Sequence, residues 1–224
     1  MKPSPPSDLM LHFYIVCSTA SVRPNRKTPP VSTTRRTVDE DAILDATLKS
    51  VMAIGIRRTT MSDIARQADV SRVTVYRRFG DLATLIAALM TREFGAVLAT
   101  AQEQTAGEHD ARSRLVALAV HGAELLCEHP LLHRILDVDP EIVLPYVTLR
   151  AGRFQQAVIE IYAQELRAGM EDGSIAPGDP GAMAAAIELA QRGFVLSARS
   201  RHTARQRATA AHELRRMLEG YLRP

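Results

Sequence analysis

The chain has 224 residues and a formal net charge of +3; 46% of its residues are hydrophobic and 24% are charged. This length can bury a sizeable core and exceeds that of one small domain. The two cysteines, Cys17 and Cys127, lie far apart in the chain, which argues against a structural disulfide and fits a reducing cytoplasm. Tryptophan is absent and aromatic residues make up 4%, while alanine is abundant. We therefore predict an all-α protein with essentially no strand.

Residues 1–36 have the composition of a disordered, basic extension. They contain six prolines, and residues 1–38 hold six Lys or Arg against one acid, a balance that opposes a packed core. Within this extension, the apolar run at 9–17 is similar to a short signal peptide. His12 interrupts this run, which is also too short to span a membrane. A start codon upstream of the native one would explain it better, so we expect no membrane association.

A first folded helix is predicted from Thr37 to the residue before Gly55. Thr37 and Glu40 have the spacing of a capping box, and Gly55 can end the helix in a left-handed conformation. The apolar residues between these ends recur at helical intervals, as expected for one buried face. They are Ile43, Leu44, Leu48, Val51 and Met52.

Two short helices then follow, separated by a three-residue break. Thr60 can N-cap the first helix, with Asp63 three residues later as its capping-box partner. Asp69 and Val70 form the break, and Ser71 is a suitable N-cap for the second helix. This is the layout of a helix-turn-helix. The first helix has one narrow apolar face whose small side chains let a second helix approach closely, formed by Met61, Ile64, Ala65 and Ala68.

The second of these helices, from Arg72 to about Phe79, has the features of a DNA-reading helix. Val75 and Phe79 lie four residues apart and should turn inward, which directs the charged side chains outward, as a major groove requires. Arginine can bind guanine through two hydrogen bonds, and threonine and tyrosine can contact bases or phosphates. We predict base contacts from Arg72, Val73, Thr74 and Arg77, phosphate contacts from Thr60, Tyr76 and Arg78, and a contribution to the same site from Ser71.

This region resembles the tetracycline-repressor (TetR) type of transcriptional regulator. The family usually has a phosphate-binding lysine at the start of the next helix, whereas this chain has Gly80, Asp81 and Leu82, so we expect that contact to be missing. The resemblance implies a three-helix DNA-binding head over 37–82 and a helical effector-binding and dimerisation domain over 83–224. It is carried by the helix at 43–55, T-T-M-S-D-I-A at 59–65, V-S-R-V-T-V-Y-R-R-F at 70–79 and D-L-A-T-L-I-A-A-L at 81–89.

Hydrophobic periodicity and turn residues predict further helices beyond Leu82. Pro130, Pro140 and the sequence G-S-I-A-P-G-D-P-G at 173–181 mark breaks between them. The first of these helices is long enough to join the head to the rest of the chain. We expect helices at 82–104, 110–128, 131–137, 141–172, 180–200 and 203–222.

The last two predicted helices are the best candidates for a dimer interface. Their apolar residues recur at helical spacing, and small side chains permit the close approach that a four-helix interface between two subunits requires. An ordinary core within one chain is the alternative explanation of the same pattern. The candidate residues are Met183, Ile187, Ala190, Phe194, Ala208, Ala211, Leu214 and Leu218.

The resemblance also implies a small-molecule pocket within the helical domain. For each candidate for its lining, an ordinary core or surface position is the simpler interpretation; the candidates are Phe94, Leu98, His121, Leu125, Tyr146, Arg150, Phe154 and Tyr162. The one cluster of soft metal ligands is Cys127, His129, His133 and Asp137, but Pro130 interrupts it, so we expect no metal site. Neither a catalytic triad, paired carboxylates nor a phosphate-binding loop is evident, and we predict neither an enzyme nor a cofactor.

Our main hypothesis is a homodimeric, cytoplasmic transcriptional regulator, most simply a repressor that leaves a palindromic operator when a small-molecule effector binds. The basic extension at 1–36 can add minor-groove or phosphate contacts, or it can be a solvated leader, and both interpretations stay open. One alternative is a DNA-packaging protein that uses the same head without an effector. A second is a helical small-molecule-binding protein whose head no longer binds DNA.

Overall fold

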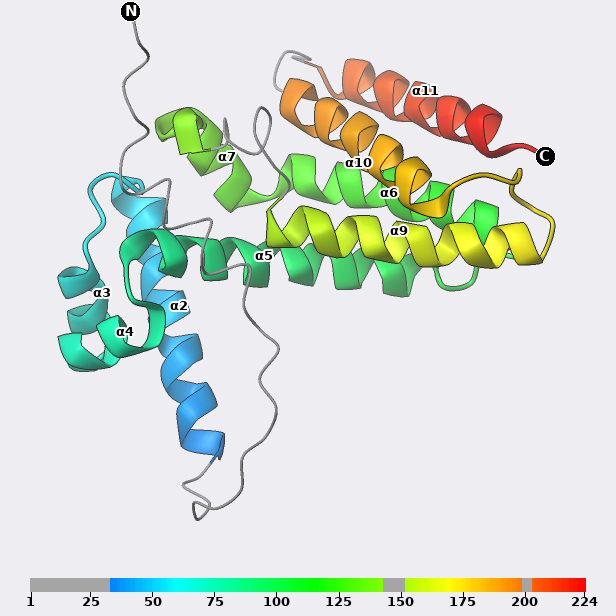
Figure 1. Cartoon of the computed structure of the whole chain (residues 1–224). Helices are drawn as coiled ribbons and strands as arrows, with labels where there is room; N and C mark the ends of the chain where they lie inside the picture. Colours follow the sequence, from blue (N-terminus) through cyan, green and yellow to red (C-terminus); the bar gives the residue numbers. More distant parts are fainter. Residues whose placement is uncertain (1–32, 143–151, 199–202) are drawn as a thin grey trace, which may run out of the picture. The chain divides into compact units, whose positions relative to one another are not determined.

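The computed structural model of the chain describes residues 33–142, 152–198 and 203–224 (Figure 1). Throughout these residues every regular element is a helix, which confirms the predicted all-α class. The elements are α2 (Thr33–Ile54), α3 (Met61–Gln67), α4 (Arg72–Phe79), α5 (Leu82–Thr105), α6 (Ala111–Glu128), α7 (Pro130–Val138), the 3-10 turn η1 (Pro140–Ile142), α9 (Arg153–Glu171), α10 (Pro180–Ser197) and α11 (Ala204–Leu222).

The chain forms two compact units. The head unit contains the described residues up to Arg92 together with the distant segment Arg134–Ile142. The body unit contains Glu93–His133 and the described residues of Val143–Pro224. Helices α5 and α7 therefore each begin in one unit and end in the other. The sequence predicts a boundary near residue 82 and gives no sign of the second segment of the head unit.

The head unit has an apolar core to which α2, α3, α4 and the start of α5 all contribute. Helix α3 packs against both α2 and α4, and Gln67 Nε2 in α3 donates a hydrogen bond to Ser50 Oγ in α2 at 2.9 Å. Gly55 follows α2 with φ +82°, which confirms its predicted left-handed conformation. The most deeply buried core residues of this unit include Ile43, Val51, Ile64, Val75 and Leu85.

Helix α2 begins before its predicted start. It starts at Thr33, so Thr37 lies inside the helix and the predicted N-cap at Thr37 is wrong. The carboxylate of Glu40 has a distant partner instead: it accepts from Arg78 Nε at 3.1 Å and from Arg78 Nη2 at 2.8 Å. This ion pair ties α4 to α2 and helps to fix the orientation of α4 within the head unit.

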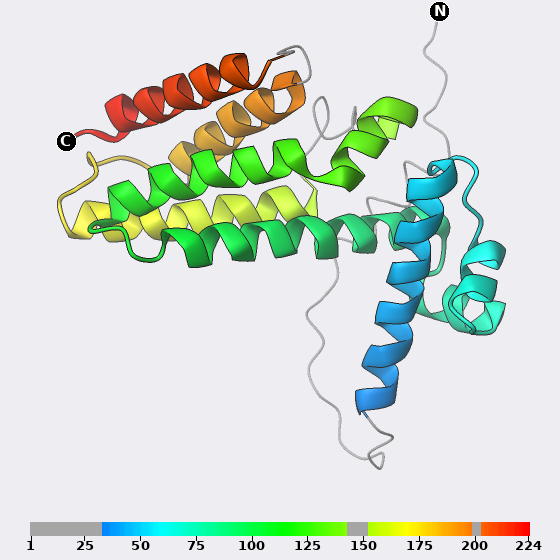
Figure 2. The same cartoon turned by 180° about the vertical axis from the view of Figure 1, so that it is seen from behind.

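Helix α6 is the central helix of the body unit. It packs against α9, α10 and α11, and α10 and α11 lie side by side in both views of the chain (Figures 1 and 2). All residues from Leu115 to Val120 are buried. Because these consecutive residues cover more than one full turn, this part of α6 is enclosed on every side.

A chain of hydrogen bonds crosses the core of the body unit. The Tyr162 hydroxyl in α9 donates to Gln191 Oε1 in α10 at 2.8 Å, and Gln191 Nε2 donates to Ala119 O in α6 at 2.9 Å. Burial raises the pKa of Tyr162, so its hydroxyl stays protonated and remains a donor. Three helices are thus joined through polar groups that would destabilise the core if they were unpaired.

The single helix predicted over 141–172 is wrong. Residues Pro140–Ile142 form a 3-10 turn, Gly152 has an extended backbone, and α9 begins only at Arg153. Residues 143–151 lie outside the described part of the chain. The helices predicted at 82–104, 110–128, 131–137, 180–200 and 203–222 are confirmed, with ends that differ by at most three residues.

Helix α5 is long and apolar enough to cross a membrane by length and composition alone. Several of its large apolar side chains are nevertheless buried within the folded chain. Leu85 and Leu89 belong to the core of the head unit, and Phe94 and Leu98 to that of the body unit. One side of α5 thus contributes to the core of each unit, although only 28% of its apolar window is buried.

Replacing Tyr162 by Phe should lower the free energy of unfolding by about 1–2 kcal/mol, because the buried Gln191 Oε1 would lose its donor. Urea unfolding followed by circular dichroism measures this loss. The matched control is Tyr76→Phe, since the Tyr76 side chain is 51% exposed and should change stability by less than about 0.5 kcal/mol. Equal losses in the two variants would contradict the role assigned to the hydrogen-bond chain.

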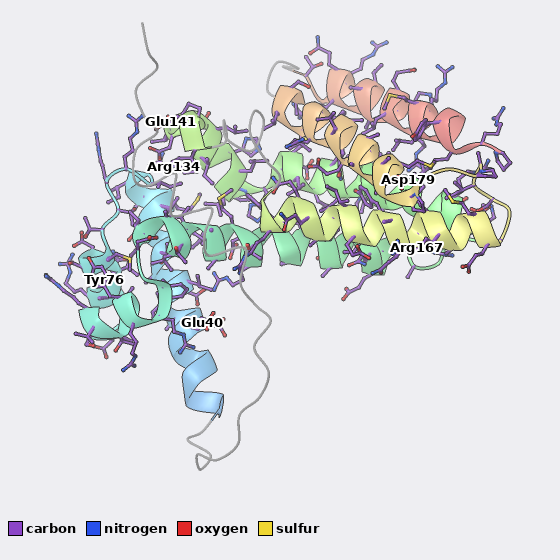
Figure 3. All side chains as sticks on the ribbon, in the orientation of Figure 1. Glu40, Tyr76, Arg134, Glu141, Arg167 and Asp179 are labelled. Carbon is purple, nitrogen blue, oxygen red and sulfur yellow. The ribbon has the colours of Figure 1, made fainter. Side chains whose placement is uncertain are left out.

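A double-mutant cycle of Arg78→Ala and Glu40→Ala should give a coupling energy of about 0.5–1 kcal/mol, because the Arg78 side chain is only 21% exposed. The control cycle uses Arg167 and Glu160 in α9, whose side chains are 51% and 63% exposed; Figure 3 labels Arg167 and Glu40. Water screens the control pair more strongly, so its coupling should be smaller. Unfolding by urea measures both, and a larger coupling in the control pair would contradict the prediction.

Candidate nucleic-acid interface

Helix α3 is capped by the side chain of Thr60, the residue directly before it. Thr60 Oγ1 accepts a hydrogen bond from Asp63 N at 3.1 Å and donates one to Asp63 Oδ2 at 2.7 Å, which confirms the predicted N-cap. The hydrogen bond from Thr60, with a smaller contribution from the charge of Arg66, holds the pKa of Asp63 below its ordinary value. The carboxylate is therefore ionised at the positive end of the helix dipole, where it stabilises the start of α3.

The chain reverses sharply between α3 and α4. Asp69 has φ +54°, a left-handed conformation that Asp adopts more readily than most residues, and Val70 N donates to Ala65 O at 3.0 Å. Ser71 then N-caps α4, since its Oγ accepts from Thr74 N at 3.1 Å. The two capped helices and this turn form a helix-turn-helix, as predicted.

Helix α4 has one buried face and one exposed face. Val75 and Phe79 are buried, whereas Val73 is 70% exposed and Tyr76 is 51% exposed. The side chains of Arg72 and Arg77 are also exposed, and α4 contains no acid. Figure 3 labels Tyr76 on this helix. The exposed face is therefore basic and bears both apolar and hydrogen-bonding groups, which are the groups that read a major groove.

The structure brings all eight predicted contact residues together on the helix-turn-helix. The side-chain oxygens of Thr60 and Ser71 serve as helix caps, and Thr74 is half-buried beside Ser71. Arg78 is half-buried and paired with Glu40. It therefore helps to position α4, in addition to the phosphate contact predicted for it. The local pattern could not reveal this role, because Glu40 lies 38 residues earlier. The individual DNA contacts stay predictions.

Two residues beside the helix-turn-helix were not among the predicted contacts. Arg58 is exposed in the segment that leads to Thr60, a position from which a cation can reach phosphates; its spacing ahead of the N-cap could have indicated it. At the start of α5, Asp81 Oδ1 accepts from Thr84 N at 2.7 Å. Asp81 thus caps α5. The next residue, Leu82, stands where the TetR family usually has a phosphate-binding lysine.

The predicted ligand-binding residues that the structure describes all lie in the body unit. Phe94, Leu98 and Tyr162 are buried in its core, and the ring of Phe94 contacts that of Phe154 edge-on with centroids 5.7 Å apart. These residues therefore pack the core, and their contact with any ligand stays a prediction. Outside the described residues lie Tyr146 and Arg150.

His121 and Leu125 line a half-open pocket of about 320 Å³ at the surface of the body unit. The pocket lies between α6, α10 and α11, and its wall combines apolar side chains with acids, a thiol and one guanidinium. This composition can hold a molecule with both polar and apolar parts. The remaining lining residues are Glu124, Cys127, Glu128, Phe194, Ala204, Arg207 and Ala208.

The predicted dimer residues mostly face the core of their own chain. Buried within it are Met183, Ile187, Phe194, Ala211, Leu214 and Leu218, whereas Ala190 is half-buried and Ala208 is exposed. The opposite faces of the same two helices carry exposed small and apolar residues. These outward strips consist of Ala182, Ala185, Ala186, Leu189 and Gly193 on α10, and Met217, Gly220 and Tyr221 on α11.

The soft-ligand cluster of the sequence does not assemble around one point. Among the described residues, no three His, Cys, Asp or Glu side chains are close enough to share a metal ion. His129 lies edge-on to the ring of Phe94 instead, with centroids 5.4 Å apart. Burial lowers the pKa of His129, which favours the neutral ring as a packing group.

Known proteins similar to this chain cover most of its length. Residues 43–89 match the sequence profile of the family described as "Bacterial regulatory proteins, tetR family". An uncharacterized HTH-type transcriptional regulator of Mycobacterium bovis is 33% identical over 180 residues, which is 80% of this chain and 92% of the relative. The likeness therefore extends well beyond the helix-turn-helix into the body unit.

Solved structures have the same fold. A TetR-family transcriptional regulator from Pectobacterium atrosepticum matches with a TM-score of 0.67 at 21% identity, covering 85% of this chain and 97% of that one. The regulator FadR from Bacillus subtilis, in complex with stearoyl-CoA, matches with a TM-score of 0.59 at 17% identity, covering 81% and 98%. With the helix-turn-helix and the Mycobacterium relative, these findings lead to one conclusion: the chain belongs to the TetR family of helix-turn-helix transcriptional regulators.

Proposed function

We propose that this regulator binds a palindromic DNA operator as a homodimer and represses transcription until a small molecule releases it. The exposed face of α4 carries the proposal. It presents Arg72, Val73, Tyr76 and Arg77 on a helix whose other side is buried in the head unit. In the major groove, the arginines can donate two parallel hydrogen bonds to guanine, and Val73 can contact a thymine methyl group.

A second copy of the chain is needed for useful sequence specificity. One recognition helix of this length contacts few base pairs, whereas a two-fold dimer reads two half-sites about 34 Å apart or a multiple of that distance. The outward strips of α10 and α11 support such a dimer, because small residues let helices of two subunits approach closely. Leu189 is 59% exposed and Met217 is 50% exposed. A second subunit would remove these apolar side chains from water.

The small-molecule effector is proposed to bind within the body unit. The half-open pocket lined by His121 and Leu125 supports this. The complex of FadR with stearoyl-CoA is a property of that protein; for this chain we propose an effector of unspecified chemistry. Because α5 and α7 run from one unit into the other, a rearranged body can shift the operator affinity, typically by 1–3 kcal/mol. We propose that this occurs in the bacterial cytoplasm.

Replacing Arg77 by Ala should weaken operator binding by about 1–3 kcal/mol and relax base preference, because a bidentate contact to guanine would be lost. Thr74→Ala and Arg72→Ala should act in the same direction. The probe is a duplex selected from random sequence by the wild-type protein, and the measurement is fluorescence anisotropy at several salt concentrations.

The control for this experiment is Arg167→Ala, which removes the same charge from an exposed position in α9 of the body unit. It should leave operator affinity close to that of the wild type. Uniform, weak binding of every duplex by all variants would favour the DNA-packaging alternative. Failure of the folded wild type to bind any duplex would favour the small-molecule-binding alternative.

Replacing Leu189 by Arg should convert the dimer into a monomer, since it places a charge in the middle of the proposed interface. Sedimentation velocity would then show one subunit mass at concentrations where the wild type shows two. The control is Ala157→Arg, which adds the same side chain at an exposed position in α9. A wild-type mass in the Leu189 variant, or a monomeric control, would argue against the strips as the interface.

A further inference from the structure

A segment far along the chain completes the head unit. Residues Arg134–Ile142, which comprise the end of α7, Asp139 and the turn η1, belong to this unit, although the match to the family profile ends at residue 89. Figure 3 labels Arg134 and Glu141 in this segment. The segment contacts the end of α2 and the loop that leads to the helix-turn-helix.

Arg134 binds the C-terminal end of α2. Its Nε donates to Val51 O at 3.3 Å and its Nη2 donates to Ala53 O at 3.0 Å. Val51 O also accepts from Gly55 N at 2.9 Å. The last carbonyl groups of a helix as a rule lack partners within the helix, and they carry the negative end of its dipole. A guanidinium is a suitable group for this position because it offers several donors and a positive charge.

Asp139 binds the first backbone amide beyond that helix end. Its Oδ2 accepts from Ile56 N at 2.7 Å, and both residues are buried, with exposures of 1% and 4%. Arg57 Nε lies 3.8 Å from Asp139 Oδ1, and Arg57 also pairs with Glu141. The buried carboxylate therefore has both a hydrogen-bond donor and a nearby positive charge. We refer to Arg134 and Asp139 together as the polar clamp.

Two further contacts hold the loop between α2 and α3, one at Gly55 and one between Thr59 and Gly55. A Cβ on Gly55 would lie 2.8 Å from Val138 Cγ1 and 2.9 Å from Asp139 Oδ2, so the segment approaches the backbone as closely as glycine allows. Thr59 Oγ1 donates to Gly55 O at 2.7 Å. Thr60, the next residue, is the N-cap of α3. The clamp thus sets the position of the five residues before the helix-turn-helix.

We propose that Asp139 and Arg134 are positioning residues for DNA binding, which act by holding the loop between α2 and α3 in the geometry that presents α4 to DNA. This inference rests on the proposed function, because it assigns the clamp a role in operator binding. Neither residue needs to touch DNA. The negative charge of Asp139 would by itself oppose binding to phosphates. The positioning role of Asp139 therefore predicts weaker DNA binding when the residue is removed, whereas its charge alone predicts tighter binding.

The test compares Asp139→Ala with Asp139→Asn in the full chain, using the selected duplex as the probe. The Ala variant should bind the duplex about tenfold more weakly or worse, because Ile56 N would lose its buried acceptor. The Asn variant should recover most of the affinity, since its amide oxygen can accept the same hydrogen bond. Asp41→Ala is the control: it removes an exposed acid of α2 and should leave binding unchanged or slightly tighter.

Hydrogen exchange at the Ile56 amide provides a readout that does not require DNA. This amide should exchange faster in the Ala variant than in the wild type or the Asn variant. If the Ala variant does not fold, Arg134→Met carries the test, because it keeps the aliphatic stem but removes the donors to Val51 O and Ala53 O; it should also weaken binding.

Two results would overturn the proposal. One is a folded Ala variant that binds the duplex as tightly as the wild type or more tightly, as loss of a negative charge alone predicts. The other is unchanged exchange of Ile56 in that variant. If the wild type binds no duplex while Ile56 exchange responds as expected, the clamp exists but the proposed function fails, and so does the role of the clamp in DNA binding.

Discussion

The proposed DNA-binding face of this protein depends on one packing constraint, the burial of Val75 and Phe79 on the same side of α4. Burying side chains of this size stabilises a fold by roughly 1.5–3 kcal/mol each, which is more than an exposed ion pair contributes. That burial fixes the rotation of α4 about its own axis. Arg72, Val73 and Arg77 are left on the exposed side, so the proposed reading face is a direct consequence of how the head unit forms its core.

Polar interactions add precision to this arrangement. The caps at Thr60 and Ser71 contribute about 1 kcal/mol each, and they decide where α3 and α4 begin. Arg78 then ties α4 to α2 through Glu40. In the body unit, Tyr162 and Gln191 join three helices in a similar way. Apolar burial provides most of the stability in both units, whereas the directional hydrogen bonds determine which of several similar packings is adopted.

Helix α10 illustrates how one element can serve two surfaces. Its residues Met183, Ile187 and Phe194 are buried in the body unit, while Leu189 and Gly193 are exposed on the other side. Both faces are rich in small or apolar residues, so the periodicity is compatible with either face turned inward. Packing against α6 and α9 selects the inner face, and this choice leaves the outward strip available for the proposed second subunit.

The sequence alone determined the features that depend on near neighbours. The all-α class, the caps at Thr60 and Ser71, the left-handed Gly55 and the inward face of α4 follow from residues a few positions apart, because helical periodicity and capping are local. Three features came instead from the packing of the folded chain: the pairing of Glu40 with Arg78, the buried face of α10 and the contact of Asp139 with Ile56. Asp139 and Ile56 are 83 positions apart in the chain. Such distant partners are determined by how the helices pack, and local sequence patterns do not encode helix packing.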